Sequence, residues 1–198
     1  MDRTDFIVGL MKENTDALGF IPRPTIVKQF IRTDRIIIQR NRYRKAIGYL
    51  LHGPVHPDGH LIIHQACIRL DKRCAGFGRQ ALSELLTRAA RARALTITLR
   101  CAWDLEAIAF WFESGFTPVA IVPGGKRRRR SIVSFRRALR GDDVDAGQPD
   151  RRDQVPAGQV DNPTSFSRPF SDFLPLLGSR SSTAKRLRLH AGLDRLPS

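Results

Sequence analysis

Residues 60–102 constrain the fold more than any other segment, because a strand pattern, a helix pattern and a second strand pattern follow one another there. The run HLIIHQACIRL at 60–70 is rich in β-branched and apolar residues, as buried strands are. From residue 77 to residue 90, apolar residues recur at a period near 3.6, which predicts an amphipathic helix. LTITLRCA at 95–102 is a second strand pattern. Two strands joined by a helix favour a parallel pair and an α/β sheet.

The segments before this unit predict two helices and a hairpin. Residues 6–20 and 25–32 have helical spacing, and Gly19 is the expected end of the first helix. The apolar runs at 36–38 and 44–53 are expected to pair as two strands of a hairpin.

The segments after this unit predict one helix and a second hairpin. Asp104 is expected to cap a helix that runs through Glu113, because its carboxylate can accept the first free N–H groups. The strand patterns at 116–122 and 131–139 are joined by PGGKRRRR and form a C-terminal β-hairpin.

Positive charge is concentrated in the first 140 residues. The 198-residue chain has a formal net charge of +15, whereas residues 141–198 hold eight Lys or Arg, eight Asp and no Glu. The surplus therefore lies within residues 1–140, where it favours polyanions or anionic cofactors as ligands. Solvated arginines that keep the chain soluble are the other interpretation.

Composition changes after Arg140. Six of the twelve prolines fall within 141–198, and apolar periodicity disappears there. We therefore predict one domain over 1–140 and a disordered, neutral tail over 141–198. Residues 183–196, TAKRLRLHAGLDRL, form either a short amphipathic helix or a frayed part of this tail.

The cysteines and the lack of long apolar segments predict a cytoplasmic protein without a membrane partner. Cys67, Cys74 and Cys101 form no paired framework and have no zinc-ligand spacing, which fits a reducing compartment and predicts no metal site. The N-terminus lacks the apolar core of a signal peptide. No segment approaches the roughly 18 apolar residues that span a bilayer.

The turn DKRCAGFGRQAL at 71–82 has the character of an anion-binding site. Gly76 and Gly78 let the backbone approach a ligand closely and direct consecutive N–H groups toward it. These amides lie at the start of a helix, where unsatisfied donors and the helix dipole both favour an anion. Arg73 and Arg79 flank the turn. A glycine turn that merely starts a helix is the alternative.

A dinucleotide-binding turn fits the same glycines less well. Gly76, Gly78 and Ala81 match G-x-G-x-x-A, but that turn follows its strand directly. Here the residues from Asp71 to Ala75 intervene, and the next strand ends in Arg100 and Cys101 rather than in an acidic residue.

The turn and a later segment together resemble a known superfamily. Arg73-x-x-Gly76-x-Gly78 is similar to the R/Q-x-x-G-x-G/A signature of the GNAT acyl-coenzyme A N-acyltransferases. DLEAIAFWFESGF at 104–116 resembles their later N-x-x-A…GF segment, with Asp104 in the Asn position. The resemblance covers about residues 20–137. LGFIPR, Gln65, FW and PGGKRRRR are in addition similar to phage-associated members.

This resemblance implies a mixed central sheet flanked by helices, with a C-terminal β-hairpin. The first strand of that fold is weak or missing, because the chain begins with a helical pattern. The implied activity is transfer of an acyl group, preferentially acetyl, from acetyl-coenzyme A to an amine, and dimers are common in the superfamily. The implied coenzyme-binding residues are Ile68, Arg73, Cys74, Ala75, Gly76, Phe77, Gly78, Arg79 and Asp104.

Catalytic residues follow the resemblance less closely. Trp111 stands where many members have a tyrosine acid, and indole cannot supply a proton at neutral pH. His64 stands on the strand where some members carry a base, and an imidazole can accept a proton there. A structural or solvent-facing histidine is the alternative, and strand alternation directs Gln65 to the opposite face.

The basic turn of the C-terminal hairpin has three interpretations. It consists of Lys126, Arg127, Arg128, Arg129 and Arg130. In the GNAT architecture this turn borders the acceptor site, so its cations would select an anionic acceptor or contact nucleic acid. The third interpretation is a solvated charge run.

Two functions remain open at this point. The first is an N-acyltransferase that uses acetyl-coenzyme A and an amine acceptor. The second is a catalytically degenerate GNAT-like scaffold that binds nucleic acid through residues 126–130, which the tryptophan at position 111 and the basic turn both favour.

Overall fold

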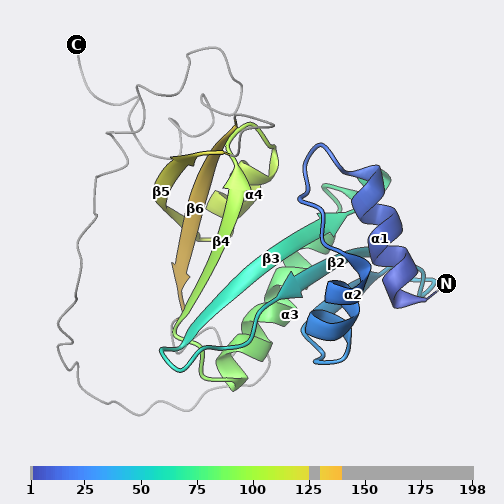
Figure 1. The fold of residues 1–198 in the computed structure, drawn as a ribbon, viewed down its shortest axis with the longest axis horizontal. Coiled ribbons are helices and arrows are strands. Elements are labelled where there is room, and N and C mark those ends of the chain that lie inside the picture. Colours follow the sequence, from blue (N-terminus) through green and yellow to red (C-terminus); the bar gives the residue numbers. More distant parts are fainter. Residues whose placement is uncertain (1, 125–129, 140–198) are drawn as a thin grey trace. The chain divides into compact units, whose positions relative to one another are not determined.

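The computed structural model of the chain describes residues 2–124 and 130–139 (Figure 1). The predicted tail over 141–198, with its helix at 183–196, lies outside these residues, as do Lys126 to Arg129. The described residues fall into two compact units. The first unit runs to Arg100 and includes the segment that begins at Arg136, and the second unit runs from Cys101 to Phe135. The single domain predicted over 1–140 therefore stays a prediction.

Six strands and their connecting helices confirm the predicted mixed α/β sheet. The strand order is β1-β2-β3-β4-β6-β5, with β1/β2 and β2/β3 antiparallel and β3/β4 parallel. The strands are β1 Ile36–Arg40, β2 Ala46–His52, β3 His60–Ile68, β4 Thr96–Ala102, β5 Thr117–Pro123 and β6 Ser131–Ala138. The helices are α1 Arg3–Glu13, α2 Arg23–Thr25, the π-helical turn η1 Ile26–Ile31, the 3-10 turn η2 Leu70–Lys72, α3 Phe77–Arg91 and α4 Ala107–Glu113.

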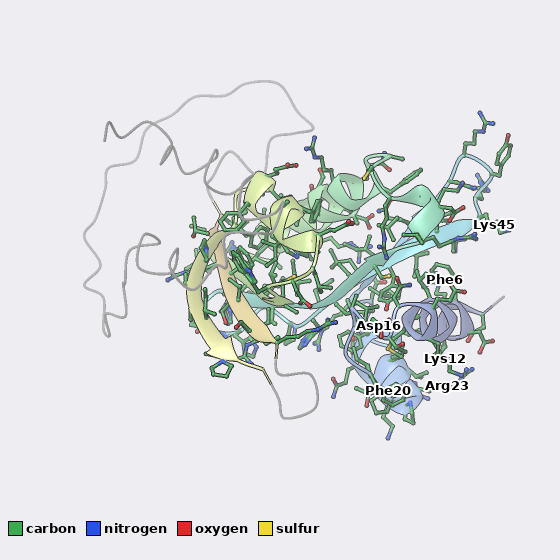
Figure 2. All side chains as sticks on the ribbon, turned by 90° about the horizontal axis from the view of Figure 1, so that it is seen from above. Phe6, Lys12, Asp16, Phe20, Arg23 and Lys45 are labelled. Atoms are coloured by element: carbon green, nitrogen blue, oxygen red, sulfur yellow. The ribbon has the colours of Figure 1, made fainter. Side chains whose placement is uncertain are left out.

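In the first unit, helices cover both faces of the strands (Figure 1; Figure 2). Helix α3 packs against β1, β2 and β3 with its apolar stripe, of which Leu82 and Leu85 are buried. Helix α1 and the turn η1 cover the opposite face. Their core cluster consists of Phe6, Ile7, Leu10, Met11, Ile26, Phe30, Ile36, Tyr49, Leu51 and Cys67. Strand alternation thus divides β1 to β3 between two apolar layers.

Helix α1 is shorter than its spacing predicts. It ends at Glu13, and the side-chain amide of Asn14 donates to the carbonyl of Leu10 at 2.8 Å. This bond satisfies one of the last-turn carbonyls, so the chain leaves the helix well before Gly19. The prediction of a helix over 6–20 was therefore too long. At the other end, the Asp2 carboxylate caps the helix by accepting from the N–H of Thr4 at 3.2 Å.

The loop that follows α1 is fixed to strand β3 by a buried polar chain. The Tyr49 hydroxyl donates to Oε1 of Gln65 at 2.7 Å, and Nε2 of Gln65 donates to the carbonyl of Gly19 at 2.7 Å. Both side chains are buried, and burial raises the pKa of Tyr49, so its hydroxyl stays protonated and keeps donating. The side-chain groups of Tyr49 and Gln65 are paired with each other and with Gly19. These bonds therefore hold the loop and the strand together without leaving an unpaired polar atom at either residue.

We predict that the free energy of unfolding falls as the pH drops below about 6.5, the ordinary histidine pKa. Burial lowers the pKa of His52 and of His64 in the folded state. The unfolded chain therefore binds protons first, and stability is lost as the pH falls. His52 contributes because Nδ1 is engaged with the carbonyl of Gly53 at 2.8 Å, while its buried Nε2 has no partner among the described residues.

Urea unfolding at about pH 7.5 and about pH 5.5 tests this linkage. His52→Asn keeps a donor for Gly53 and removes the titrating group, so its stability should depend less on pH than that of the wild type. His56→Asn is the matched control, because it makes the same substitution at an exposed histidine. Equal pH dependence in the wild type and His52→Asn would contradict it.

Candidate functional site

The parallel pairing of β3 with β4 ends partway along β3. The paired residues run from His60↔Thr96 to Ile63↔Leu99, whereas pairing of β3 with β2 continues to Ile68↔Gly48. The part of β3 from His64 to Ile68 is thus paired with β2 along one edge, and its other edge is not paired with β4. Its outer backbone groups can pair with an extended ligand that carries amide groups, as an added strand would.

Strand β3 leads directly into a turn with two left-handed residues. The 3-10 turn η2 ends at Lys72 with Arg73 as its C-cap residue, and then Cys74 has φ +59° and Gly76 has φ +81°. Arg73 itself is extended, with φ −67° and ψ 162°. Turns that contain left-handed residues can direct backbone N–H groups toward an anion. Of the two glycines that the sequence singled out, Gly76 is left-handed, and the other left-handed residue of the turn is Cys74. Anion binding by this turn stays a prediction.

Helix α3 begins at the end of this turn without a side-chain cap. Gly76 is its N-cap residue, and the N–H of Gln80 makes an i→i−4 bond to the Gly76 carbonyl at 3.1 Å. The first N–H groups of an α-helix generally lack the i→i−4 acceptor that later residues have. The helix dipole adds partial positive charge at the same place. A Cβ built on Gly76 would meet nothing within 4 Å, so a side chain at this position would enter open space.

Arg73 braces the turn rather than extending from it. Its Nε donates to the carbonyl of Ile68 at 3.2 Å, and Nη2 donates to Oδ1 of Asn14 at 2.7 Å. The guanidinium thus ties the end of β3, the turn and the end of α1 together. Sequence reasoning placed Arg73 beside the ligand and missed Asn14, whose only signal was an asparagine near a helix end.

His64 is a partly covered residue of β3 whose side chain still reaches solvent, in the part of the strand that extends past the pairing with β4. Its ring makes an edge contact with Phe30, with ring centres 5.4 Å apart. Burial lowers the pKa of His64, so the imidazole is neutral at neutral pH and can accept a proton. Gln65 is buried, and a bulge between the pairs Leu51↔Gln65 and His52↔Ile63 leaves His64 without a partner on β2. Regular strand alternation therefore does not hold at His64, and the prediction that Gln65 lies on the face opposite His64 is not confirmed.

In the second unit, Asp104 pairs with Arg130. The Asp104 carboxylate lies 3.2 Å from Nε of Arg130, and helix α4 begins at Ala107 with Glu106 as its N-cap residue. The prediction that Asp104 caps this helix was wrong, because its carboxylate is engaged by a guanidinium from the C-terminal hairpin. The sequence predicted that Asp104 binds the coenzyme and that Arg130 binds the acceptor. In the structure these two side chains contact each other.

Trp111 is a buried core residue of the second unit, with 6% of its surface exposed. Its ring makes edge contacts with Phe110 at 4.8 Å and with Phe116 at 5.3 Å between centres. This aromatic packing accounts for the tryptophan without a role in proton transfer.

The buried cysteines lack nucleophilic character. Burial raises the pKa of Cys67 to about 11 and that of Cys101 to about 12, so both thiols are protonated at neutral pH. Among residues 2–124 and 130–139, no three His, Cys, Asp or Glu side chains gather as a metal site would require. The groups that stay available for chemistry in the described part of the chain are the backbone amides of the turn and the neutral imidazole of His64.

No family model and no curated protein matches the sequence. Solved structures do match the fold. Ard1 from Thermoplasma volcanium aligns with TM-score 0.60 and 14% identity, covering 69% of this chain and 90% of Ard1. An acetyltransferase of the GNAT family from Desulfovibrio desulfuricans aligns with TM-score 0.54 and 16% identity, covering 71% and 95%. The chain has a GNAT fold.

A third structure with this GNAT fold was solved with a ligand. It is an aminoglycoside 6'-N-acetyltransferase complexed with coenzyme A, with TM-score 0.59, 12% identity and coverage of 76% of this chain and 97% of that one. Within the described part of the chain, no helix is both long and apolar enough to cross a bilayer. The similarity to phage-associated members stays a prediction.

We predict that Gly76→Ala lowers the free energy of unfolding by about 1 kcal/mol, because alanine at φ +81° is strained. Gly76→Asn should lose less, since asparagine tolerates the left-handed region. The space around Gly76 is open, so neither side chain clashes. Urea unfolding measures both variants, and equal losses would show that the left-handed conformation is not what the glycine supplies.

Proposed function

We propose that this chain transfers an acyl group, preferentially acetyl, from coenzyme A to an amine. One arrangement supports the proposal most. The edge of β3 extends past its parallel partner β4, and the strand leads through a turn with left-handed residues into the start of α3, which has no side-chain cap. A diphosphate with an amide-containing arm fits such an arrangement, because the amides of the turn hold anions and the strand edge pairs with amides.

Each part of this arrangement has a distinct role in the proposal. The backbone amides from Cys74 to Arg79 would hold the pyrophosphate of the coenzyme. The edge of β3 from His64 to Ile68 would pair with the amide groups of the pantetheine arm. Arg73 is a positioning residue, since its bonds to Ile68 and Asn14 keep the turn in place.

The reaction needs a neutral amine and a stable leaving thiolate. His64 is the base that we assign, because its lowered pKa leaves the imidazole unprotonated and able to take a proton from the amine. The nitrogen then forms the new bond to the acyl carbon, and the carbon–sulfur bond breaks. A thiol has a pKa near 8.5, so the thiolate leaves without an acid at the position of Trp111.

The remaining expectations stay proposals. A cytoplasmic location fits the three free cysteines at positions 67, 74 and 101. Selection of an anionic acceptor by residues 126–130 and a homodimer are also proposals. The proposed reaction requires no metal ion.

The alternative function is a basic nucleic-acid-binding module on a GNAT fold that does not catalyse. The burial of Trp111 among aromatic rings, in the position of a family acid, favours it. Failure of the purified protein to bind acetyl-coenzyme A, with retained binding of nucleic acid that is lost on neutralising Lys126 to Arg130, would support this alternative.

We expect calorimetric titration of the nuclease-treated protein with acetyl-coenzyme A to show micromolar binding. Gly76→Arg should weaken it more than tenfold, because the side chain projects into the space in front of the turn. Gly19→Arg is the matched control, since it adds the same charge at a glycine that also has nothing within 4 Å of a Cβ. Undiminished binding by Gly76→Arg would exclude the turn as the coenzyme site.

We expect His64→Gln to lower kcat about 100-fold while the Kd for acetyl-coenzyme A stays unchanged. Thiol release is followed with a panel of peptide amines, polyamines and aminoglycosides as acceptors. With the best acceptor, the wild-type kcat should rise with an apparent pKa below 6.5, and this limb should disappear in the variant. Full activity of His64→Gln would assign His64 a structural role.

A further inference from the structure

The turn between β1 and β2 combines positive charge with an exposed aromatic ring. Residues 40–45 read RNRYRK, so four cations and one tyrosine occur in six residues. Arg40, Arg42, Tyr43, Arg44 and Lys45 are all exposed, and the Tyr43 ring is 72% exposed. Neither the coenzyme site nor the C-terminal basic turn includes these residues.

The turn is an ordered platform for these side chains. Oδ1 of Asn41 accepts from the N–H groups of Tyr43 and Lys45, both at 3.0 Å. The Arg40 guanidinium donates to the carbonyl of Arg44 at 2.8 Å. Arg44 has φ +60°, a conformation that glycine or asparagine adopts more easily. The turn thus places an arginine, Arg44, at a position whose backbone conformation favours glycine or asparagine.

Tyr43 and Arg42 form a stacking surface. The Arg42 guanidinium carbon lies 4.7 Å from the centre of the Tyr43 ring. The ring stays largely exposed in spite of this contact. An exposed tyrosine with a guanidinium on it offers the two groups on which unpaired nucleic-acid bases stack.

A groove of about 450 Å³ lies between this turn and helix α1. The cations that line it are Arg3, Arg40, Arg44, Lys45 and Arg69. Two carboxylates, Asp5 and Glu13, also line it, and Asp5 accepts from Arg23 at 2.6 Å. Figure 2 shows Lys45 and Phe6 of α1 close to one another at this end of the first unit. Five cations against two carboxylates give the groove a positive potential that attracts phosphates.

The cations of the turn are not neutralised within the described part of the chain. None of Arg40, Arg42, Arg44 and Lys45 makes an ion pair with a described carboxylate, in contrast to Arg69, which pairs with Asp71 at 3.1 Å. Charge alone would suit any polyanion, including an acidic peptide. The exposed ring favours nucleic acid over an acidic peptide, because bases stack on aromatic rings. It favours a single strand over a duplex, because the bases of a duplex are already stacked on each other.

We propose that the β1–β2 turn and the adjoining groove bind single-stranded nucleic acid. Phosphates contact Arg42, Arg44 and Lys45, one base stacks on Tyr43, and the backbone enters the groove beside α1. This binding does not depend on coenzyme A or on acyl transfer, and RNA and DNA share the chemistry that it recognises.

Fluorescence anisotropy of the full chain tests the proposal with labelled 12-nucleotide oligouridylate and oligothymidylate and with a 12-base-pair duplex. Both single strands should bind more tightly than the duplex, and a preference between them identifies the RNA or DNA source. Tyr43→Ala should weaken single-strand binding about tenfold, whereas Tyr43→Phe should keep it. Arg42→Gln/Arg44→Asn/Lys45→Gln should reduce the slope of log K against log salt by about 2.

The control variant Lys28→Gln/Arg32→Gln/Arg91→Gln removes the same charge from exposed residues that do not line the groove, and it should keep most of the slope. Thermal unfolding verifies that each variant is folded.

Unchanged affinity in Tyr43→Ala, or equal effects of the two triple variants, would overturn the proposal. Displacement of the single strand by a 12-residue oligoglutamate at equal charge concentration would instead identify a general polyanion site and also overturn it. The proposal would also be overturned if single-strand binding were lost only when residues 126–130 are neutralised.

Discussion

The early end of the parallel pairing between β3 and β4 is the constraint on which the candidate site depends. Four residues of each strand pair, up to Ile63 and Leu99, while β3 continues to Ile68 against β2. Backbone groups on an unpaired strand edge must find partners, and here a ligand with amide groups can supply them. The same strand then delivers the chain to the turn before α3. The strand edge and the amides of the turn are therefore parts of one continuous stretch of backbone.

Two sets of hydrogen bonds hold this stretch in place. The buried chain from Tyr49 through Gln65 to Gly19 fixes the face of β3 that lies under α1. Arg73 fixes the other end by bonding to Ile68 and Asn14. A pre-ordered cradle binds an anion without the entropic cost of first ordering a loop. The two left-handed residues in the turn are tolerated because these contacts determine the path of the chain on both sides.

The helices and strands with strong periodicity were predictable, whereas their ends and polar partners were not. The pattern from residue 77 to residue 90 corresponds to helix α3, and the run at 60–70 corresponds to β3. The end of α1 was missed because the Asn14 side chain competes with the next helical N–H for a carbonyl, which spacing does not reveal. Asp104 was missed as an ion-pair partner because Arg130 is remote in sequence.

The sequence by itself determined the fold class and the position of the glycine turn before α3, because periodicity and glycine spacing act over a few neighbouring residues. Tertiary structure decided what each polar side chain does. Arg73 became a brace, Trp111 became a core residue, and the RNRYRK turn became an ordered basic surface with an exposed ring. These outcomes depend on partners brought close by folding, and hydrogen bonds, desolvation and ring contacts act only at such short range.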